Sequence, residues 1–94
     1  VQTCALPICL CPPSIGHACF ELIRDTMAQH VMVEEDEIRA AMRILLECTK
    51  MLAEPSGATA LAAALSGRIA DGNDPLVVIV SGGNIDVERL KSLL

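Results

Sequence analysis

The sequence predicts an α/β fold, with a partial parallel sheet covered by helices. Residues 76–80 are five consecutive apolar residues, four of them β-branched, which is typical of a strand buried on both faces. Helical patterns and short extended segments alternate along the chain, and this alternation favours a parallel sheet. Phe20 is the only aromatic residue in a chain that is 52% hydrophobic. Aliphatic side chains must therefore build the core, which suits helices packed on a sheet.

Size, charge and hydropathy exclude several classes of protein. With 94 residues, the chain is one domain at most. Its net charge of −5 and its pI near 4.8 provide no basic field to attract nucleic acid or an anionic membrane. No apolar run approaches the roughly 20 residues that span a membrane, and the N-terminus lacks the pattern of a secretory signal. We therefore expect a cytoplasmic protein that binds neither nucleic acid nor membrane.

The cysteine pattern predicts no metal site. The number of cysteines is odd, and their spacing in the first twenty residues matches no zinc motif. His17 and His30 are too isolated in the sequence to complete a site. We interpret the cysteines as ordinary thiols. The five cysteines are Cys4, Cys9, Cys11, Cys19 and Cys48.

Residues 1–15 differ in character from the rest of the chain. Residues 1–8 resemble the translated end of a sequencing adapter, and Pro12 and Pro13 exclude a helix at this point. We expect residues 1–15 to be a non-native or disordered segment and residues 16–94 to form the domain. The alternative is a native, irregular N-terminal arm.

Apolar periodicity predicts two helices in the first half of the domain. Residues 17–29 carry Phe20, Ile23 and Met27 at helical spacing. Residues 35–50 give the clearest helical pattern. Each charge pair on the charged face of this helix contributes only about 0.2–0.5 kcal/mol to helix stability, so we interpret that face as solvated and not as a binding patch. The opposite, apolar face comprises Ile38, Ala41, Met42, Leu45 and Thr49.

Short extended segments and a third helix follow from local signals. Residues 31–33 and 51–53 are candidate strands. Pro55 suits the first turn of a helix that continues over residues 56–65, and Gly67 supplies its end. Alanines and leucines surround this helix on nearly all sides, which indicates a buried helix that neighbours approach closely. The alanines in question are Ala58, Ala60, Ala62, Ala63 and Ala64.

The last third of the chain contains the apolar strand and a final helix. A turn-rich link over residues 70–75 leads into the strand, and a helix begins at about Asp86, whose side chain can cap it. The strand needs cover on both faces and partners at both edges, but the chain offers only two other short strands. We therefore expect exposed apolar surface and poor solubility. The helical period of the last helix is given by Val87, Leu90, Lys91 and Leu94, with Leu93 alongside.

The candidate binding site is the turn Ser81-Gly82-Gly83-Asn84, which follows the apolar strand directly. In open α/β sheets, ligands bind just beyond the carboxyl ends of strands. Glycines there let the backbone approach a flat ligand, and Ser81 offers one hydroxyl. On spacing alone, this segment is also consistent with a plain strand-to-helix turn. Glu54, the acid of a second candidate motif, is likewise consistent with an ordinary acidic residue at a helix start, where the helix dipole favours negative charge. Nucleophile-elbow, dinucleotide-binding and Walker motifs do not occur.

From about Gly16 to Leu94 the chain resembles the C-terminal part of threonine ammonia-lyases, in the group that includes serine racemase. These are pyridoxal-phosphate enzymes of the tryptophan-synthase-β fold type. The resemblance covers about the last quarter of such a catalytic domain, and four segments carry it in order. They are Phe20-Glu21-Leu22-Ile23-Arg24-Asp25, Glu37-Ile38-Arg39-Ala40-Ala41-Met42, Glu54-Pro55-Ser56-Gly57-Ala58 and Ser81-Gly82-Gly83-Asn84-Ile85-Asp86.

The resemblance implies a cofactor site for pyridoxal 5'-phosphate. It implies that the hydroxyl of Ser81 hydrogen-bonds the pyridine nitrogen and that Glu54 lies near the ring. It also implies that Gly82 and Gly83 let the backbone pass beside the ring, while Asn84 fixes the turn. A hydroxyl cannot keep the ring nitrogen protonated as a carboxylate would. The ring is then a weaker electron sink, which suits elimination of a β-hydroxyl group.

The implied activity is removal of water and then ammonia from L-threonine (and L-serine), giving 2-oxobutanoate (pyruvate), in an enzyme that is a homo-oligomer. The family's Schiff-base lysine, its phosphate-binding loop and its metal-binding acids lie upstream of the matching region. Lys50 and Lys91 do not match the lysine motif, so we assign no catalytic residue and expect the fragment to be inactive alone. Glu34 replaces the usual serine before the second helix and is a poorer cap.

The sequence leaves four other interpretations open. Within the family, the chain is consistent with a fragment of a serine racemase or of a hydroxyaspartate ammonia-lyase. Outside it, the chain could be a small non-enzymatic α/β module that binds a ligand at the Ser81 turn, or a regulatory remnant without a ligand.

Overall fold

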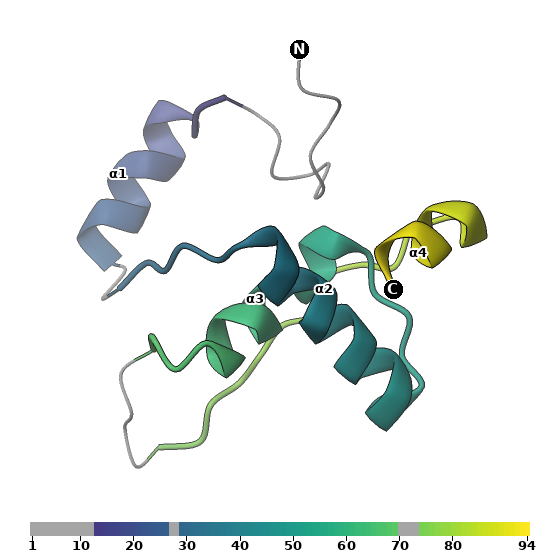
Figure 1. Cartoon of the computed structure of the whole chain (residues 1–94). Helices are drawn as coiled ribbons and strands as arrows, with labels where there is room; N and C mark the ends of the chain where they lie inside the picture. Colours follow the sequence, from purple (N-terminus) through teal and green to yellow (C-terminus); the bar gives the residue numbers. More distant parts are fainter. Residues whose placement is uncertain (1–12, 27–28, 70–73) are drawn as a thin grey trace.

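Helices form all the regular secondary structure that is observed. The structure is a computed structural model that describes residues 13–26, 29–69 and 74–94. Its elements, in order, are α1 (His17–Thr26), α2 (Glu35–Ile44), a π-helical turn η2 (Leu45–Thr49), α3 (Pro55–Leu65) and α4 (Val87–Leu93) (Figure 1). Within these ranges, none of the helices has the length and apolar character that crossing a membrane requires.

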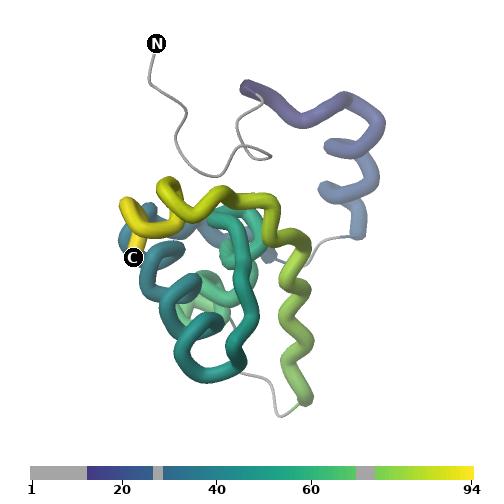
Figure 2. Tube along the Cα trace, turned by 90° about the vertical axis from the view of Figure 1, so that its right-hand side faces the viewer, coloured from purple at the N-terminus to yellow at the C-terminus, as the bar shows by residue number. Residues whose placement is uncertain are grey.

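The predicted parallel sheet does not form among the residues that the structure describes. The three candidate strands, residues 31–33, 51–53 and 76–80, are neither helical nor paired in a ladder. Figure 2 shows the segment between residue 74 and α4 as a long, uncoiled trace along one side of the molecule. A strand needs backbone partners on a neighbouring strand, and no described segment provides them. The parallel sheet of the predicted fold class is therefore not observed in the described residues.

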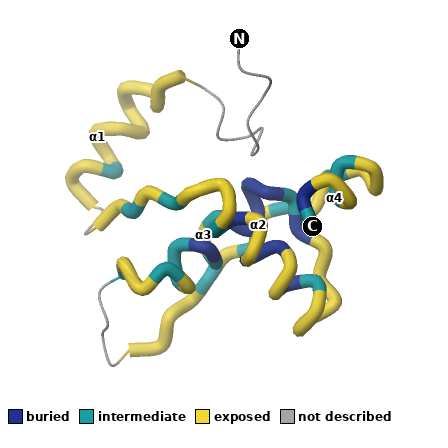
Figure 3. Tube along the Cα trace, in the orientation of Figure 1, coloured by how far each residue is buried: buried dark blue, intermediate teal, exposed yellow. Residues whose placement is uncertain are grey.

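Segment 76–79 is mostly exposed, with only Val78 half-buried, as the sequence led us to expect for an all-apolar strand without partners. Leu76, Val77 and Ile79 are 61%, 83% and 73% exposed, and Figure 3 shows this stretch mostly as exposed surface. Contiguous apolar exposure of this kind marks a surface that a partner normally covers.

Helix α1 confirms the first predicted helix from residue 17 to residue 26, and Met27 lies outside the described residues. None of its residues is buried, and Phe20 is 50% exposed. In Figure 1 the helix lies apart from α2 and α3. Its apolar side therefore contributes nothing to the core that the described residues form.

Helix α2 and the π-helical turn η2 together confirm the helix predicted over residues 35–50. The carboxylate of Glu37 accepts a hydrogen bond of 2.7 Å from the Glu34 N–H, as part of a capping box. This contact compensates for the unusual residue at the cap. The helix ends at Lys50, whose φ of 60° is left-handed and turns the chain away from the helix axis.

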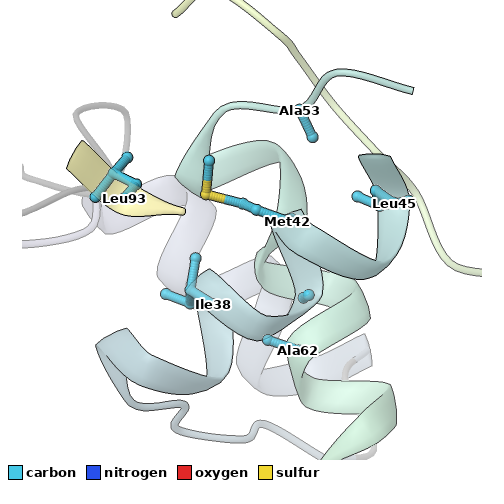
Figure 4. Packing of buried hydrophobic residues seen from close by; sticks show 8 residues of the cluster. Ile38, Met42, Leu45, Ala53, Ala62 and Leu93 are labelled. Atoms are coloured by element: carbon cyan, nitrogen blue, oxygen red, sulfur yellow. The ribbon is translucent and has the colours of Figure 1, made fainter. Parts of the chain in front are cut away.

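The hydrophobic core lies between α2 and α3. Ile38, Ala41, Met42 and Leu45 are buried as predicted, and Figure 4 shows the core side chains gathered around Met42. Thr49 was expected on the same face but is exposed, because it is the last residue of η2 and its hydroxyl donates to the Leu45 carbonyl at 2.6 Å. Ala53, Ala58, Ala62 and Leu93 complete the core.

Helix α3 begins and ends as predicted, with Pro55 in its first turn and Gly67, at φ +71°, just beyond its end. Its burial is one-sided, which corrects the expectation of a helix buried on nearly all sides. Ala58 and Ala62 are buried, whereas Ala60 is exposed. Alanine on the buried side lets α2 approach closely. The other side of α3 is left uncovered because the predicted sheet is not present among the described residues.

Helix α4 starts at the predicted cap and closes the core at one end. The Asp86 carboxylate accepts a hydrogen bond of 2.8 Å from the Arg89 N–H. Leu93 is buried, while Val87 is 64% exposed, so the predicted apolar stripe is only partly covered. The Arg43 guanidinium of α2 donates to the Leu94 carbonyl and ties the end of α4 to the core.

A charged cluster fastens the end of α3 to the start of α2. The Arg68 guanidinium lies 2.6 Å from the Glu37 carboxylate and also donates to the Met32 carbonyl at 2.7 Å. The hydrogen bond from Arg68, followed by that from the Glu34 N–H, lowers the pKa of Glu37. The same ion pair raises the pKa of Arg68. Arg68 thus connects the end of α3 both to the first turn of α2 and to the segment that leads into it.

Candidate functional site

The structure brings the two candidate motifs together. The Glu54 N–H donates to the Gly82 carbonyl at 3.0 Å, although the two residues are far apart in the sequence. Glu54 is the residue that precedes α3, and Gly82 follows the uncoiled segment 76–80. The start of a core helix therefore holds the Ser81 turn in place.

Glycines permit this contact because the two backbones pass too closely for side chains. A Cβ added to Gly57 would lie 2.3 Å from the Gly82 carbonyl oxygen, and one added to Gly83 would lie 2.6 Å from the Leu52 carbonyl oxygen. A Cβ added to Gly82 would lie 2.5 Å from Oε1 of Glu54. Two of the three positions thus face backbone atoms, which cannot turn away as a side-chain end can.

The turn itself is held by backbone hydrogen bonds. The Ile85 N–H donates to the Gly83 carbonyl at 2.9 Å, so that Asn84 lies inside a tight turn. Ser81, Gly83 and Asn84 are exposed. The predicted binding residues thus lie together at the surface, with the Glu54 carboxylate beside Gly82.

A groove of about 620 Å³ runs between α3 and the segment before the turn. Ser56 and Ser81 both line it. Ser56 is 8% exposed, and its Oγ has no hydrogen-bond partner in the part of the chain that is described. A buried hydroxyl without a partner is unfavourable, so the groove suits an occupant with a polar group at this point. Its lining is completed by Gln29, His30, Val31, Thr59, Ala60, Ala63, Ile69, Leu76, Val77, Val78 and Ile79.

Sequence reasoning did not identify Ser56 and Gly57 as part of this junction. A signal was present, because glycine in a helix is less favourable than alanine by about 1 kcal/mol. A glycine two residues after the proline that starts a helix therefore indicates a close approach by another segment. The identity of that segment is not readable from the sequence.

Neither lysine of the sequence borders the groove. The Lys50 ammonium donates to the Glu47 carbonyl at 2.8 Å, and the Lys91 ammonium lies 3.1 Å from the Glu88 carboxylate. Both contacts are at exposed helix ends. An amine that forms imines readily is usually desolvated, and these positions do not provide that environment.

The described ranges contain no group of three His, Cys, Asp or Glu side chains that could hold a metal ion. Cys19 and Cys48 are exposed free thiols. Cys4, Cys9 and Cys11 lie outside the described residues.

The residues at the junction fit one edge of a flat heteroaromatic ligand. The Ser81 hydroxyl is exposed and can donate to or accept from a ring nitrogen. Gly82 and Gly83 leave the backbone beside it without side chains, and the Glu54 carboxylate lies next to Gly82. This donor set can orient a ring, and it carries no group suited to covalent attack.

Known proteins resemble the chain over most of its length. The family described as "Pyridoxal-phosphate dependent enzyme" matches residues 7–82. The L-threonine ammonia-lyase of Geobacter sulfurreducens is 48% identical over 71 residues, which cover 76% of this chain and 18% of that protein. The catabolic L-threonine dehydratase TdcB of Escherichia coli K12 is 40% identical over 80 residues, covering 83% of this chain and 24% of that protein.

A serine racemase of Dictyostelium discoideum is 36% identical over 83 residues, which cover 86% of this chain and 26% of that protein. No solved structure matches the chain significantly. The chain thus spans between 18% and 26% of the length of these three relatives. Since the family match extends over most of the sequence, the chain belongs to the family of pyridoxal-phosphate dependent enzymes.

Proposed function

We propose that the chain is part of a lyase that dehydrates and deaminates L-threonine, and also L-serine, to 2-oxobutanoate or pyruvate and ammonia. The observation that carries this proposal is that Ser81, an exposed residue that lines the groove, lies in a turn held against the start of α3. The names of the two most similar bacterial relatives described above support the choice of substrate.

The chain's own residues orient the cofactor ring in this proposal. When bound, pyridoxal phosphate supplies the electron sink that makes the α-proton of the amino acid removable. The Ser81 hydroxyl hydrogen-bonds the ring nitrogen without giving it a full proton. Gly82 and Gly83 let the backbone lie beside the ring, Asn84 shapes the turn, and the Glu54 carboxylate lies near the ring edge.

The proton-transferring lysine belongs to a part of the enzyme outside this chain. Lys50 and Lys91 hold exposed contacts at helix ends, away from the groove. We propose that the 94-residue chain by itself has no lyase activity. The complete enzyme would be a cytoplasmic homo-oligomer.

The exposed segment 76–79 fits the same proposal. In the complete catalytic domain it would be a central strand of the tryptophan-synthase-β-like sheet, with neighbours from the chain that the relatives have in addition. Helix α3 would then cover one face of that sheet with its exposed alanines.

A racemase is the second candidate, because a serine racemase is among the relatives at 36% identity. The Ser81 turn serves both chemistries, since each begins with loss of the α-proton. A hydroxyaspartate ammonia-lyase and a non-enzymatic ligand-binding module have no comparable support.

The test is a chimera in which residues 16–94 replace the matching segment of the E. coli catabolic threonine dehydratase. Formation of 2-oxobutanoate from L-threonine is the expected activity, and D-serine formed from L-serine would indicate the racemase. Ser81→Ala should lower kcat about tenfold, the equivalent of one hydrogen bond of about 1.4 kcal/mol, whereas Ser81→Thr should retain most of it. A folded, cofactor-loaded chimera that converts neither amino acid, or an unaffected Ser81→Ala variant, would contradict the proposal.

A further inference from the structure

We propose that Gly57 is a positioning residue for the Ser81 hydroxyl. Gly57 is a buried residue in the first turn of α3. A Cβ at this position would lie 2.3, 2.9 and 3.2 Å from O, N and C of Gly82. All three atoms are backbone atoms of the residue next to Ser81. The absence of a side chain at Gly57 therefore fixes how closely the Ser81 turn lies against the helix.

If a methyl group is added at Gly57, the turn must move, since the helix cannot. The next residue, Ala58, is fully buried, and Ala62 is 1% exposed, both in the core shared with α2. Ser81 and Gly83 are exposed, so solvent leaves room for the turn to move outward. The substitution should therefore displace the Ser81 hydroxyl and leave the α2–α3 packing intact.

The hydrogen bond between Glu54 and Gly82 reports this displacement. It joins the residue that precedes α3 to the turn at 3.0 Å, on the same atom that the added methyl group would meet. Moving the Gly82 carbonyl outward breaks this bond and exposes the Glu54 amide to water.

Gly82 provides an internal comparison. A Cβ there would meet only Oε1 of Glu54 at 2.5 Å, and the end of a glutamate side chain can turn away. Gly82→Ala should therefore displace the turn less than Gly57→Ala, although Gly82 is closer to Ser81 in the sequence. Gly16 is the matched control, since an added Cβ there would have no neighbour within 4 Å.

The first experiment uses the 94-residue chain and needs no cofactor. Amide hydrogen exchange is measured by NMR for the wild type, Gly57→Ala, Gly82→Ala and Gly16→Ala. Gly57→Ala should accelerate exchange at the Glu54 amide about tenfold, the equivalent of one lost hydrogen bond, with the Met42 amide unchanged. Gly82→Ala should have a smaller effect and Gly16→Ala none. Unchanged exchange at Glu54, or equal acceleration at Met42, would overturn the inference.

The second experiment asks whether the displacement reaches the cofactor, and it rests on the proposed function. In the chimera, Gly57→Ala should change the absorbance and emission spectra of bound pyridoxal phosphate and lower kcat about tenfold, with KM for L-threonine nearly unchanged. An identical spectrum and kcat would overturn the positioning role even if Glu54 exchange increases. Because the exchange experiment does not depend on catalysis, failure of the proposed function and failure of this inference are distinguishable.

Discussion

The facing sides of α2 and α3 and the segment 76–80 are both built from apolar side chains, yet the first are buried and the second is mostly exposed. A helix satisfies its backbone hydrogen bonds internally, so α2 and α3 can pack against each other, and with Ala53 and Leu93, in a core around Met42. A strand takes its hydrogen bonds from neighbours, and the described residues offer segment 76–80 none. The comparison shows that a piece of an α/β domain retains its helix pairs more readily than its sheet.

The Ser81 turn lies where these two regions meet. It follows the exposed segment, yet the Glu54 N–H and the close approach at Gly57 attach it to the buried pair. The candidate site is therefore positioned by the stable region, although most of its neighbours in the sequence belong to the exposed one.

Met42→Ala should give the largest effect on stability, because Met42 is the largest fully buried side chain in the described part of the chain. Loss of its packing leaves a cavity and should lower the free energy of unfolding by about 2–5 kcal/mol, measured by urea denaturation. Met51→Ala is the matched control, since Met51 is 46% exposed and its truncation should have little effect. Similar losses for both variants would mean that the α2–α3 pair is not the stable region.

Asp86→Ala should have an intermediate effect, because Asp86 caps the helix that connects the exposed segment to the core. Loss of the hydrogen bond from the Arg89 N–H should destabilise α4 by about 1 kcal/mol, with faster amide exchange in residues 87–93 than in α2. Asp36→Ala serves as a control within the first turn of α2, away from the cap position. An unchanged exchange rate in α4 would show that the helix is held by Leu93 packing alone.

The Glu37–Arg68 pair predicts a pH dependence for the stable region. The pKa of Glu37 is lowered in the folded chain, so its contribution is fully present above its ordinary value of 4.5 and is lost as the pH falls through the lower, folded pKa. The difference in unfolding free energy between the wild type and Glu37→Gln should therefore shrink below that pH. A difference that stays constant from neutral pH into this acidic range would contradict the ion pair.

Val77→Lys should have the smallest effect on stability, because Val77 is 83% exposed. The free energy of unfolding should change by less than about 0.5 kcal/mol, while self-association, measured by analytical ultracentrifugation, should decrease. Val87→Lys, on exposed α4 surface, controls for the added charge. A large loss of stability in Val77→Lys would mean that segment 76–80 is packed in solution.

The helices could be predicted from the sequence because their signals are local. Pro55, Gly67 and Asp86 occupy the start and end positions that helix geometry favours, and the apolar spacing of residues 38–45 identified the core face of α2. The predicted sheet is not observed among the described residues, since a strand depends on neighbours that these residues do not provide. The grouping of Ser81 to Asn84 with Glu54 followed from the family resemblance, whereas the contact between Gly57 and Gly82 depends on how distant segments pack.

The central claim concerns the Ser81 hydroxyl and the ring nitrogen of the cofactor. The most direct measurement is the ¹⁵N chemical shift of ring-labelled pyridoxal phosphate bound to the chimera, compared between the wild type, Ser81→Ala and Ser81→Asp. We predict an unprotonated, hydrogen-bonded nitrogen in the wild type, a shift on loss of the hydroxyl, and movement towards the protonated form with the carboxylate. A signal that is identical in all three proteins would contradict the account.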